Sequence, residues 1–279
     1  MLITLLACGG PVLPSAPVLG AGFSHLCVNW TDGSIDCWGN DDHEQSQVPE
    51  GVWSDVSAGD KHTCAVGAEE GELACWGAKE DGRHLPPKGE FVDVEAGRDH
   101  ACAISAEDAS VSCWGSDERG QSTPPTGAFV QLSAGNDRTC GVKEDGSLAC
   151  WGYLEEEPPS GSFQYVAAGS ESDCAVTNAG ELTCWNHSGA LPDPDPPDGS
   201  GWEQVSIGLG DQSVICHSCA IGSDGLDCWG SCALYDGPTG EVMHSLASGE
   251  GYHCGLQQSD NRLVCWGSNQ TIAEAAESF

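Results

Sequence analysis

The sequence predicts an all-β protein in which seven three-stranded units close into a ring. The dipeptide Cys-Trp occurs seven times at a period near 38 residues, and six of the seven copies continue into Gly. Repeats of this length are typical of solenoids and propellers. The 38 glycines and 15 prolines suit short strands joined by turns, and no stretch of the repeats keeps a helical periodicity.

Each unit follows one pattern. An aromatic residue opens a β-patterned run that ends in a small residue and Gly, as in "WSDVSAG" (53–59) and "FVDVEAG" (91–97). A hairpin follows, and its turn, for example Glu144-Asp145-Gly146, places Gly where a three-residue loop needs a left-handed conformation. The return strand ends at Cys-Trp-Gly, and a loop rich in Pro, Asp and Glu leads to the next unit.

The ends of the chain favour a closed ring. A solenoid would expose strand edges at both ends and would need caps, which the sequence lacks, whereas a closed ring avoids such edges. We expect the first strand at about Val18–Gly22, so that residues 1–17 form a lipoprotein-like signal remnant and tether and residues 18–279 form the ring. Pairing of the first and last units would then close it.

The repeat also resembles a known family. "WSDVSAGDKHTCAV" followed by "GELACWG", together with "ERGQ" at 118–121, resembles the repeat of the regulator-of-chromosome-condensation family, whose units carry Ala-Gly, His-Thr, an Asp-Gly turn and Trp-Gly. The resemblance covers residues 18–268 and implies a seven-bladed β-propeller. The short period, the acidity and the cysteines look more like bacterial secreted members, which include propeller-type β-lactamase inhibitor proteins.

Every unit holds a second cysteine 9 to 11 residues before its Cys-Trp. In a hairpin the two cysteines face each other across antiparallel strands, with Cα atoms about 4.5–5.5 Å apart, within disulfide range. Zinc ligands are usually separated by two to four residues. We therefore expect one disulfide in each blade, with paired free thiols as the alternative. The expected pairs are Cys27–Cys37, Cys64–Cys75, Cys102–Cys113, Cys140–Cys150, Cys174–Cys184, Cys219–Cys228 and Cys254–Cys265.

Three cysteines are left over. Cys216 lies in an insertion of the sixth unit and Cys232 follows that unit's Trp-Gly, so an eighth disulfide, Cys216–Cys232, is expected. A metal or reactive-thiol role with His217 is the alternative. Cys8 ends the run "LLAC", which resembles a bacterial lipobox with Cys8 as the lipidated residue, although no Lys or Arg precedes the run. The alternative is an apolar terminus with a stray cysteine.

Charge and cysteine content limit the partners and the compartment. Lys and Arg number 9 against 43 Asp and Glu, a net charge of −34, which repels nucleic acid and anionic membranes and favours basic partners. The 17 cysteines indicate an oxidising compartment. We expect an extracytoplasmic protein: a bacterial outer-membrane lipoprotein, a periplasmic protein or a secreted one, with the membrane reached only through a lipid on Cys8.

Two residue sets could suggest metal sites. Four histidines (His25, His62, His100 and His217) precede the first hairpin cysteine by two residues, but other units hold Arg, Ser or Tyr there, so hydrogen bonding within the blade is the favoured reading. The acidic loops 154–159 and 192–199 lack the EF-hand pattern. No metal and no cofactor is predicted.

No catalytic motif is recognisable, so the leading hypothesis is a non-enzymatic, monomeric binding or scaffold protein. Its variable inter-repeat loops would recognise a protein partner, with Trp30, Tyr153 and Tyr235 as aromatic anchors. Inhibition of a secreted enzyme is one version, suggested by the resemblance. The alternative is an enzyme with its site at the central channel, which predicts polar residues with perturbed pKa values at one mouth. A chromatin-bound nucleotide exchange factor fits neither the acidity nor the cysteine pairs.

Overall fold

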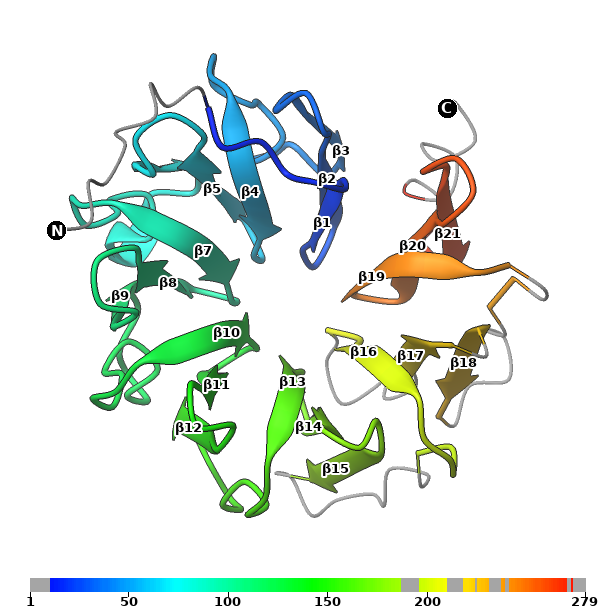
Figure 1. Ribbon diagram of the computed structural model, residues 1–279. Helices are drawn as coiled ribbons and strands as arrows, with labels where there is room; N and C mark the ends of the chain where they lie inside the picture. Colours follow the sequence, from blue (N-terminus) through cyan, green and yellow to red (C-terminus); the bar gives the residue numbers. More distant parts are fainter. Residues whose placement is uncertain are drawn as a thin grey trace, which may run out of the picture.

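Seven antiparallel three-stranded sheets surround a central channel as the blades of a propeller (Figure 1). The computed structural model describes residues 11–186, 196–209, 218–223, 225–230, 237–238, 241–269 and 272. The predicted seven-bladed propeller is confirmed, and each blade takes its inner, middle and outer strand from consecutive stretches of chain.

The strands occupy three concentric positions. The inner strands are β1 (Val18–Ala21), β4 (Trp53–Ala58), β7 (Phe91–Ala96), β10 (Phe129–Ala134), β13 (Phe163–Ala168), β16 (Trp202–Ile207) and β19 (Met243–Gly249). The middle strands are β2 (His25–Asn29), β5 (His62–Gly67), β8 (His100–Ser105), β11 (Arg138–Lys143), β14 (Ser172–Thr177), β17 (Ser218–Gly222) and β20 (Tyr252–Gln257). The outer strands are β3 (Ile35–Gly39), β6 (Leu73–Gly77), β9 (Val111–Gly115), β12 (Leu148–Gly152), β15 (Leu182–Asn186), β18 (Gly225–Trp229) and β21 (Leu263–Gly267).

The antiparallel order gives the ring two different faces. The corner face carries the corners that join inner to middle strands, such as 59–61 and 97–99. The turn face carries the hairpin turns that join middle to outer strands, such as 68–72 and 144–147. Because outer strands end at the corner face, linkers such as 78–90 leave from it and return to the turn face, where the next inner strand begins.

Each blade is fastened by one disulfide between its middle and outer strands. The two cysteines are direct register partners, for example Cys140 opposite Cys150, and in all seven blades their Cα atoms lie 4.0–4.1 Å apart. The structure therefore contains the predicted disulfide in every blade, with the predicted pairs. Cys8, Cys216 and Cys232 lie outside the described residues.

The hydrophobic cores lie between blades. In one of them Cys102 and Ile104 of the third blade contact Phe129, Leu132 and Trp151 of the fourth. The rings of Phe129 and Trp151 meet edge to face with centroids 5.8 Å apart. A disulfide of one blade thus packs against the aromatic inner strand and the tryptophan of the next, so the repeated Cys-Trp joins neighbouring blades.

The tryptophans also fasten the linkers. The indole N–H of Trp114 donates to the carbonyl of Arg83, and that of Trp151 donates to the carbonyl of Gln121, both at 2.9 Å. Arg83 lies beside the 3-10 turn η1 (Glu80–Gly82). Among the described residues no helix is long and apolar enough to cross a membrane.

The Gly at the end of the inner strand, which follows Ala in five of the seven blades, is a requirement of ring packing. A Cβ on Gly59 would lie 2.2 Å from the carbonyl oxygen of Gly97 in the next blade, and a Cβ on Gly249 would lie 2.2 Å from that of Gly22. The second contact joins the last blade to the first. There the Tyr252 hydroxyl contacts the Gly22 and His25 carbonyls at 2.8 and 2.7 Å, so the ring closes between first and last units, as predicted.

Candidate functional site

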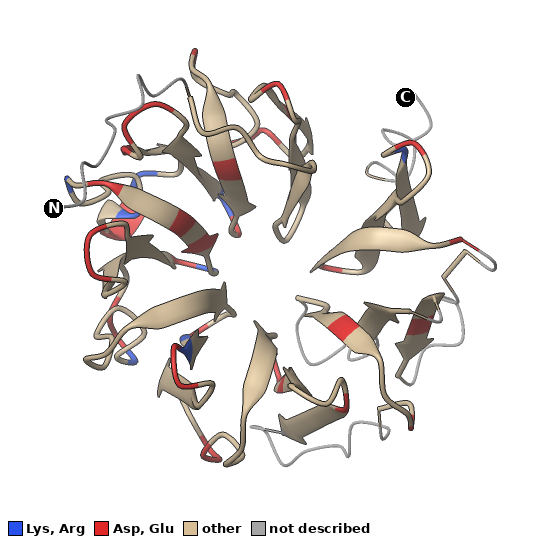
Figure 2. Cartoon of the chain, in the orientation of Figure 1, with Lys and Arg blue, Asp and Glu red and all other residues tan. Residues whose placement is uncertain are grey.

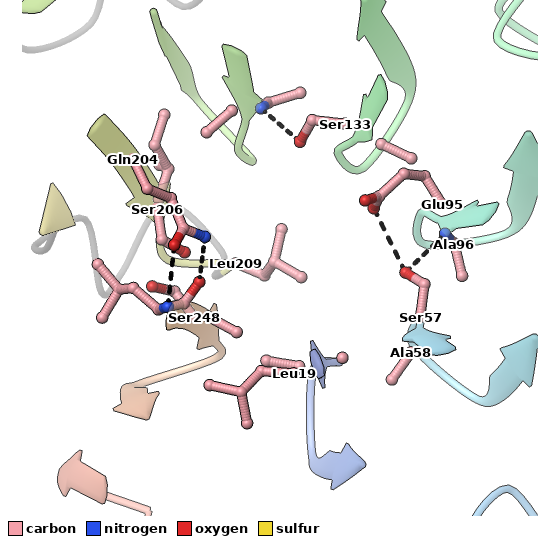
Figure 3. Close-up of a pocket in the computed structure, with 18 of the residues that line it drawn as sticks. Leu19, Ser57, Ala58, Glu95, Ala96, Ser133, Gln204, Ser206, Leu209 and Ser248 are labelled. Carbon is pink, nitrogen blue, oxygen red and sulfur yellow. Dashed lines mark hydrogen bonds between the residues drawn. The ribbon is translucent and has the colours of Figure 1, made fainter. Parts of the chain in front are cut away.

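The inner strands line a narrow central channel with their third and fifth side chains. Its cavity measures about 120 Å³ and is lined largely by small residues, Ser57, Ser133 and Ser206 among them (Figure 3). A water molecule occupies about 30 Å³ of liquid, so this space suits a few waters or a very small molecule.

The channel side chains hold neighbouring blades together. At the third position a side-chain oxygen accepts a hydrogen bond from the next inner strand, whose free edge faces the channel. These bonds run from Val94 N–H to Asp55 Oδ2 (3.0 Å), from Val166 N–H to Gln131 Oε1 (2.9 Å) and from Leu246 N–H to Gln204 Oε1 (3.1 Å). At the fifth position Ala96 N–H donates to Ser57 Oγ (3.0 Å) and Ala168 N–H to Ser133 Oγ (2.9 Å). Edge N–H groups that would otherwise lack partners are thereby satisfied.

Three carboxyl groups of adjacent blades gather at one side of this channel: Asp55 of β4, and Asp93 and Glu95 of β7. Burial raises the pKa of Asp55, although N–H donors from Val94 and Val56 oppose that rise. Burial, and then the charge of Asp55, raises the pKa of Asp93 well above its ordinary value. The pKa of Glu95 is raised well above normal by burial and by the charges of Asp93 and Asp55. The cluster therefore retains protons at pH values where ordinary carboxyl groups have lost them.

Replacing Asp93 by Asn is expected to stabilise the protein at neutral and alkaline pH. The folded-state pKa of Asp93 is raised, so its contribution is fully present below the unfolded-state pKa and is lost as the pH rises through the folded-state value. An amide keeps the acceptor without the charge, as Gln131 does in the next blade. The free energy of unfolding should rise on the order of 1 kcal/mol at pH 8, with the gain shrinking towards pH 4. Denaturant titrations at both pH values measure this, and an equal gain at both would contradict the charge explanation.

The corner face is the larger candidate surface, and its charge is unevenly distributed (Figure 2). Eight of the nine Lys and Arg residues lie between residues 61 and 143, and the remaining one is Arg262. Two parts of this face carry only acidic residues as charged groups, apart from His43. One comprises the described loops between residues 153 and 171. The other comprises the described loops of the last blade, from residue 249 onward, and of the first blade, up to residue 44. The acidic residues are Glu155, Glu156, Glu157, Glu171, Glu250, Asp41, Asp42 and Glu44. We call this set the acidic arc.

The structure separates the predicted aromatic anchors. Tyr153 is 42% exposed and lies on the corner face, where its hydroxyl donates to Glu155 at 2.5 Å and the Arg119 guanidinium lies 5.3 Å from its ring centre. Trp30 is half-buried on the turn face, donates to Asp36 at 2.8 Å and packs against the core between the last and first blades. Tyr235 lies outside the described residues. Trp30 and Tyr153 therefore do not belong to one site.

His25 and His100 form side-chain bonds between blades, so the prediction of bonding within the blade is wrong for these two histidines. His25 Nε2 lies 2.8 Å from Thr63 Oγ1, and His100 Nε2 lies 2.8 Å from Thr139 Oγ1, in each case a residue of the next blade. The corner turns each imidazole towards the neighbouring middle strand, which a single repeat considered alone does not reveal. Burial lowers the pKa of both rings to about 4, so they are neutral at pH 7.

At the equivalent position between other neighbouring blades, which we call a seam, different residue pairs meet. Arg138 and Asp173 form an ion pair with N and O 2.8 Å apart, and their side chains are 2% and 0% exposed. His62 is buried, and the residue equivalent to Thr63 and Thr139 in the next blade is Ala101. Neither ring nitrogen of His62 has a side-chain partner, and burial lowers its pKa to about 3.

Replacing Ala101 by Thr should supply the hydroxyl that this seam lacks. A buried hydrogen bond contributes about 1 kcal/mol, so A101T is expected to raise the free energy of unfolding by about that amount. The reciprocal change Thr63→Ala should lower it similarly, since it leaves His25 unpaired. Denaturant titration with the disulfides intact measures both. Overpacking rather than bonding would be indicated if A101T and Ala101→Val destabilised the protein equally.

One group of potential metal ligands occurs among the residues that the structure describes: Cys140, Cys150 and Asp173. The two sulfur atoms are joined in a disulfide and the carboxylate is paired with Arg138. The ligand atoms of this group therefore already take part in a disulfide within one blade and an ion pair between two blades.

Comparison with known proteins agrees with this architecture. Residues 91–121 and 129–153 match the sequence model of the regulator of chromosome condensation (RCC1) repeat. The third and fourth blades of the chain therefore carry regulator-of-chromosome-condensation repeats. No curated protein matches the sequence of this repeat protein.

Solved structures show the same fold in proteins of low identity. The ectodomain of the Physcomitrella patens receptor kinase CR4 superimposes with a TM-score of 0.75 at 22% identity, covering 91% of this repeat protein and 73% of that chain. The CRINKLY WD40 ectodomain of the Arabidopsis thaliana receptor kinase ACR4 gives 0.74 at 23% identity, covering 91% and 96%. Prp20p from Saccharomyces cerevisiae, described with its binding to Gsp1p and histones, gives 0.67 at 13% identity, covering 94% and 85%.

Sequence reasoning missed the channel carboxyl groups. The available signal was "FVDVEAG", in which Asp93 and Glu95 alternate with buried residues of an inner strand. On a strand, this alternation places both acids on the side away from the core, and in a propeller that side lines the channel.

Proposed function

We propose that this repeat protein is a non-catalytic, monomeric, extracytoplasmic propeller that binds a protein partner through the loops of its corner face. In this proposal it is held at a bacterial membrane by a lipid on Cys8. The observation that carries the proposal is the contrast between scaffold and loops. The blades repeat the same disulfide and a similar inter-blade core, whereas the linkers 40–52, 78–90 and 153–162 differ in sequence, and 153–162 is three residues shorter than the other two. A rigid frame that carries variable loops is a common basis for recognition.

The charge distribution supports a partner with a basic surface. The acidic arc attracts Lys and Arg side chains and would increase the rate of encounter at low salt. Tyr153 stands at one end of this arc and offers an exposed aromatic ring. Inhibition of a secreted enzyme would be one form of such binding. The compartment is supported by the seven disulfides, which a reducing cytosol would not maintain.

The test is to cross-link the oxidised protein in envelope and culture-medium fractions and to measure the affinity of the partner obtained. Tyr153→Ala, and Glu155→Gln with Glu156→Gln, should each weaken binding about tenfold or more. The turn-face variant Val92→Ser is the matched control and should bind normally. A partner that loses affinity only with Val92→Ser, or an oxidised protein without any stoichiometric partner, would contradict the proposal.

The channel carboxyl groups favour a second candidate, acid-base chemistry on a very small substrate. Asp93 and Glu95 have the raised pKa values that a general acid requires, although both also take part in contacts between blades. Asp93→Asn and Glu95→Gln distinguish the two proposals. Both variants should keep full partner binding if the corner face acts alone.

A further inference from the structure

We propose that the turn face is a lipid-facing surface, so that the anchored protein lies with this face against neutral headgroups and presents the corner face outward. This inference rests on the proposed lipid at Cys8. It adds the side of the ring that meets the membrane and therefore the side that is left for a partner.

The chain enters the ring across the turn face. Residues 11–17 form a strap that runs over the second blade to the start of β1 (Figure 1). Val12 N–H donates to the carbonyl of Ala68, in a hairpin turn, at 2.6 Å. Leu13 lies over Gly33, in the hairpin turn of the first blade, where a Cβ would be 2.8 Å from its Cδ2 atom. The strap is thus fastened to two turns of the same face.

The length of chain between the anchor and the strap is short. Cys8 precedes Val12 by four residues, which span at most about 14 Å when fully extended. The six-residue inner strands separate the two faces by about 20 Å, before their loops are counted. A lipid on Cys8 therefore reaches the turn face or the adjacent rim, and the corner face stays on the far side.

The turn face also exposes apolar side chains where such an anchor would hold it. Val12 is 73% exposed, Val92 61% and Val130 58%. Val92 and Val130 are the bulge residues of β7 and β10, which have no register partner in the sheet. Next to Val12, a groove of about 750 Å³ has an apolar side formed by Leu13, Phe91 and Val92 and an acidic side that includes Glu69, Glu70, Glu72 and Glu90. Together the apolar side chains offer a shallow apolar contact to a bilayer surface.

The acidic residues of the hairpin turns decide which lipid fits. Glu69, Glu70 and Glu107 are exposed on this face, and their charges disfavour deep insertion and repel anionic headgroups. The surface therefore fits zwitterionic lipid, with the valines at headgroup level and the carboxylates hydrated.

The four lysines of the chain provide a direct test, because two lie on each face. Lys88 and Lys143 belong to the turn face, and Lys61 and Lys79 belong to the corner face. The acylated protein would be reconstituted on phosphatidylcholine vesicles, treated with a membrane-impermeant amine reagent and digested for mass spectrometry. The soluble variant Cys8→Ser is the control, and the intact mass reports acylation. Labelling of Lys88 and Lys143 should be at least about fivefold lower on vesicles than in the control, with Lys61 and Lys79 unchanged.

The outcomes separate the two proposals. An acylated protein whose Lys88 and Lys143 react as in the soluble control, or whose Lys61 is the protected one, overturns the orientation while the anchor stands. A full-length protein without an acyl group in its native membrane overturns the anchor, and the orientation with it. Val92→Ser with Val130→Ser should partly restore Lys88 labelling on vesicles, and unchanged protection would contradict the apolar contact. Vesicles with a large share of phosphatidylglycerol should also reduce the protection.

Discussion

Reduction of the native protein is expected to unfold it in the absence of any denaturant. Each disulfide closes a loop of about 10 residues, and on the chain-entropy model each contributes about 2–3 kcal/mol. The summed contribution of seven such disulfides exceeds the net free energy of unfolding of a typical domain, which is about 5–15 kcal/mol. The effect should be large because the buried sulfur of every blade is also part of an inter-blade core, as with Cys102 against Phe129.

Circular dichroism and tryptophan fluorescence before and after full reduction measure this loss. The control is the oxidised protein in the same buffer with the reductant already consumed. A second comparison removes a single staple, with Cys64→Ala and Cys75→Ala, which should cost about 2–3 kcal/mol and leave the ring folded. A fully reduced protein that keeps its unfolding midpoint would show that the staples contribute nothing to stability.

Removing Asp173 is expected to be the most damaging single substitution at the seams between blades. Asp173→Ala leaves the guanidinium of Arg138 buried and without its carboxylate, and loss of one partner of a buried ion pair typically costs about 3–5 kcal/mol. The same change also removes the acceptor that the Gly169 N–H contacts at 3.3 Å. Denaturant titration of the oxidised variant measures the loss.

The ring itself supplies the control for this substitution. Arg138→His combined with Asp173→Thr rebuilds the pair that joins His25 to Thr63 and His100 to Thr139 at other seams. The double variant should recover most of the stability lost in Asp173→Ala. If it were no more stable than the single variant, the seam would depend on local packing rather than on a matched pair.

The repeat made the scaffold predictable from sequence. Hairpin spacing placed Cys140 opposite Cys150 with the turn Glu144-Asp145-Gly146 between their strands, and the structure has that register. Such features depend on contacts within one repeat, which are short-range and recur seven times. Ring closure also followed, because each unit brings a complete set of three strands.

Contacts between repeats were not predictable in the same way. The partner of His25 is Thr63, 38 residues away, and an isolated repeat does not show which residue its imidazole meets. The variation around the ring contained a signal: Arg in place of His is matched by Asp173 in place of Thr in the next repeat. The pKa values of Asp93 and Glu95 depend on a channel that exists only after closure.

Counting free thiols in the native protein tests the central claim most directly, since both the fold and the extracytoplasmic location depend on the staples. Intact mass would be measured after alkylation, with and without prior reduction. We expect that at most Cys216 and Cys232 react without reduction, and that all 16 cysteines other than the lipid-modified Cys8 react after it. Fourteen or more alkylated cysteines without reduction would contradict the disulfide-stapled propeller and its location outside the cytoplasm.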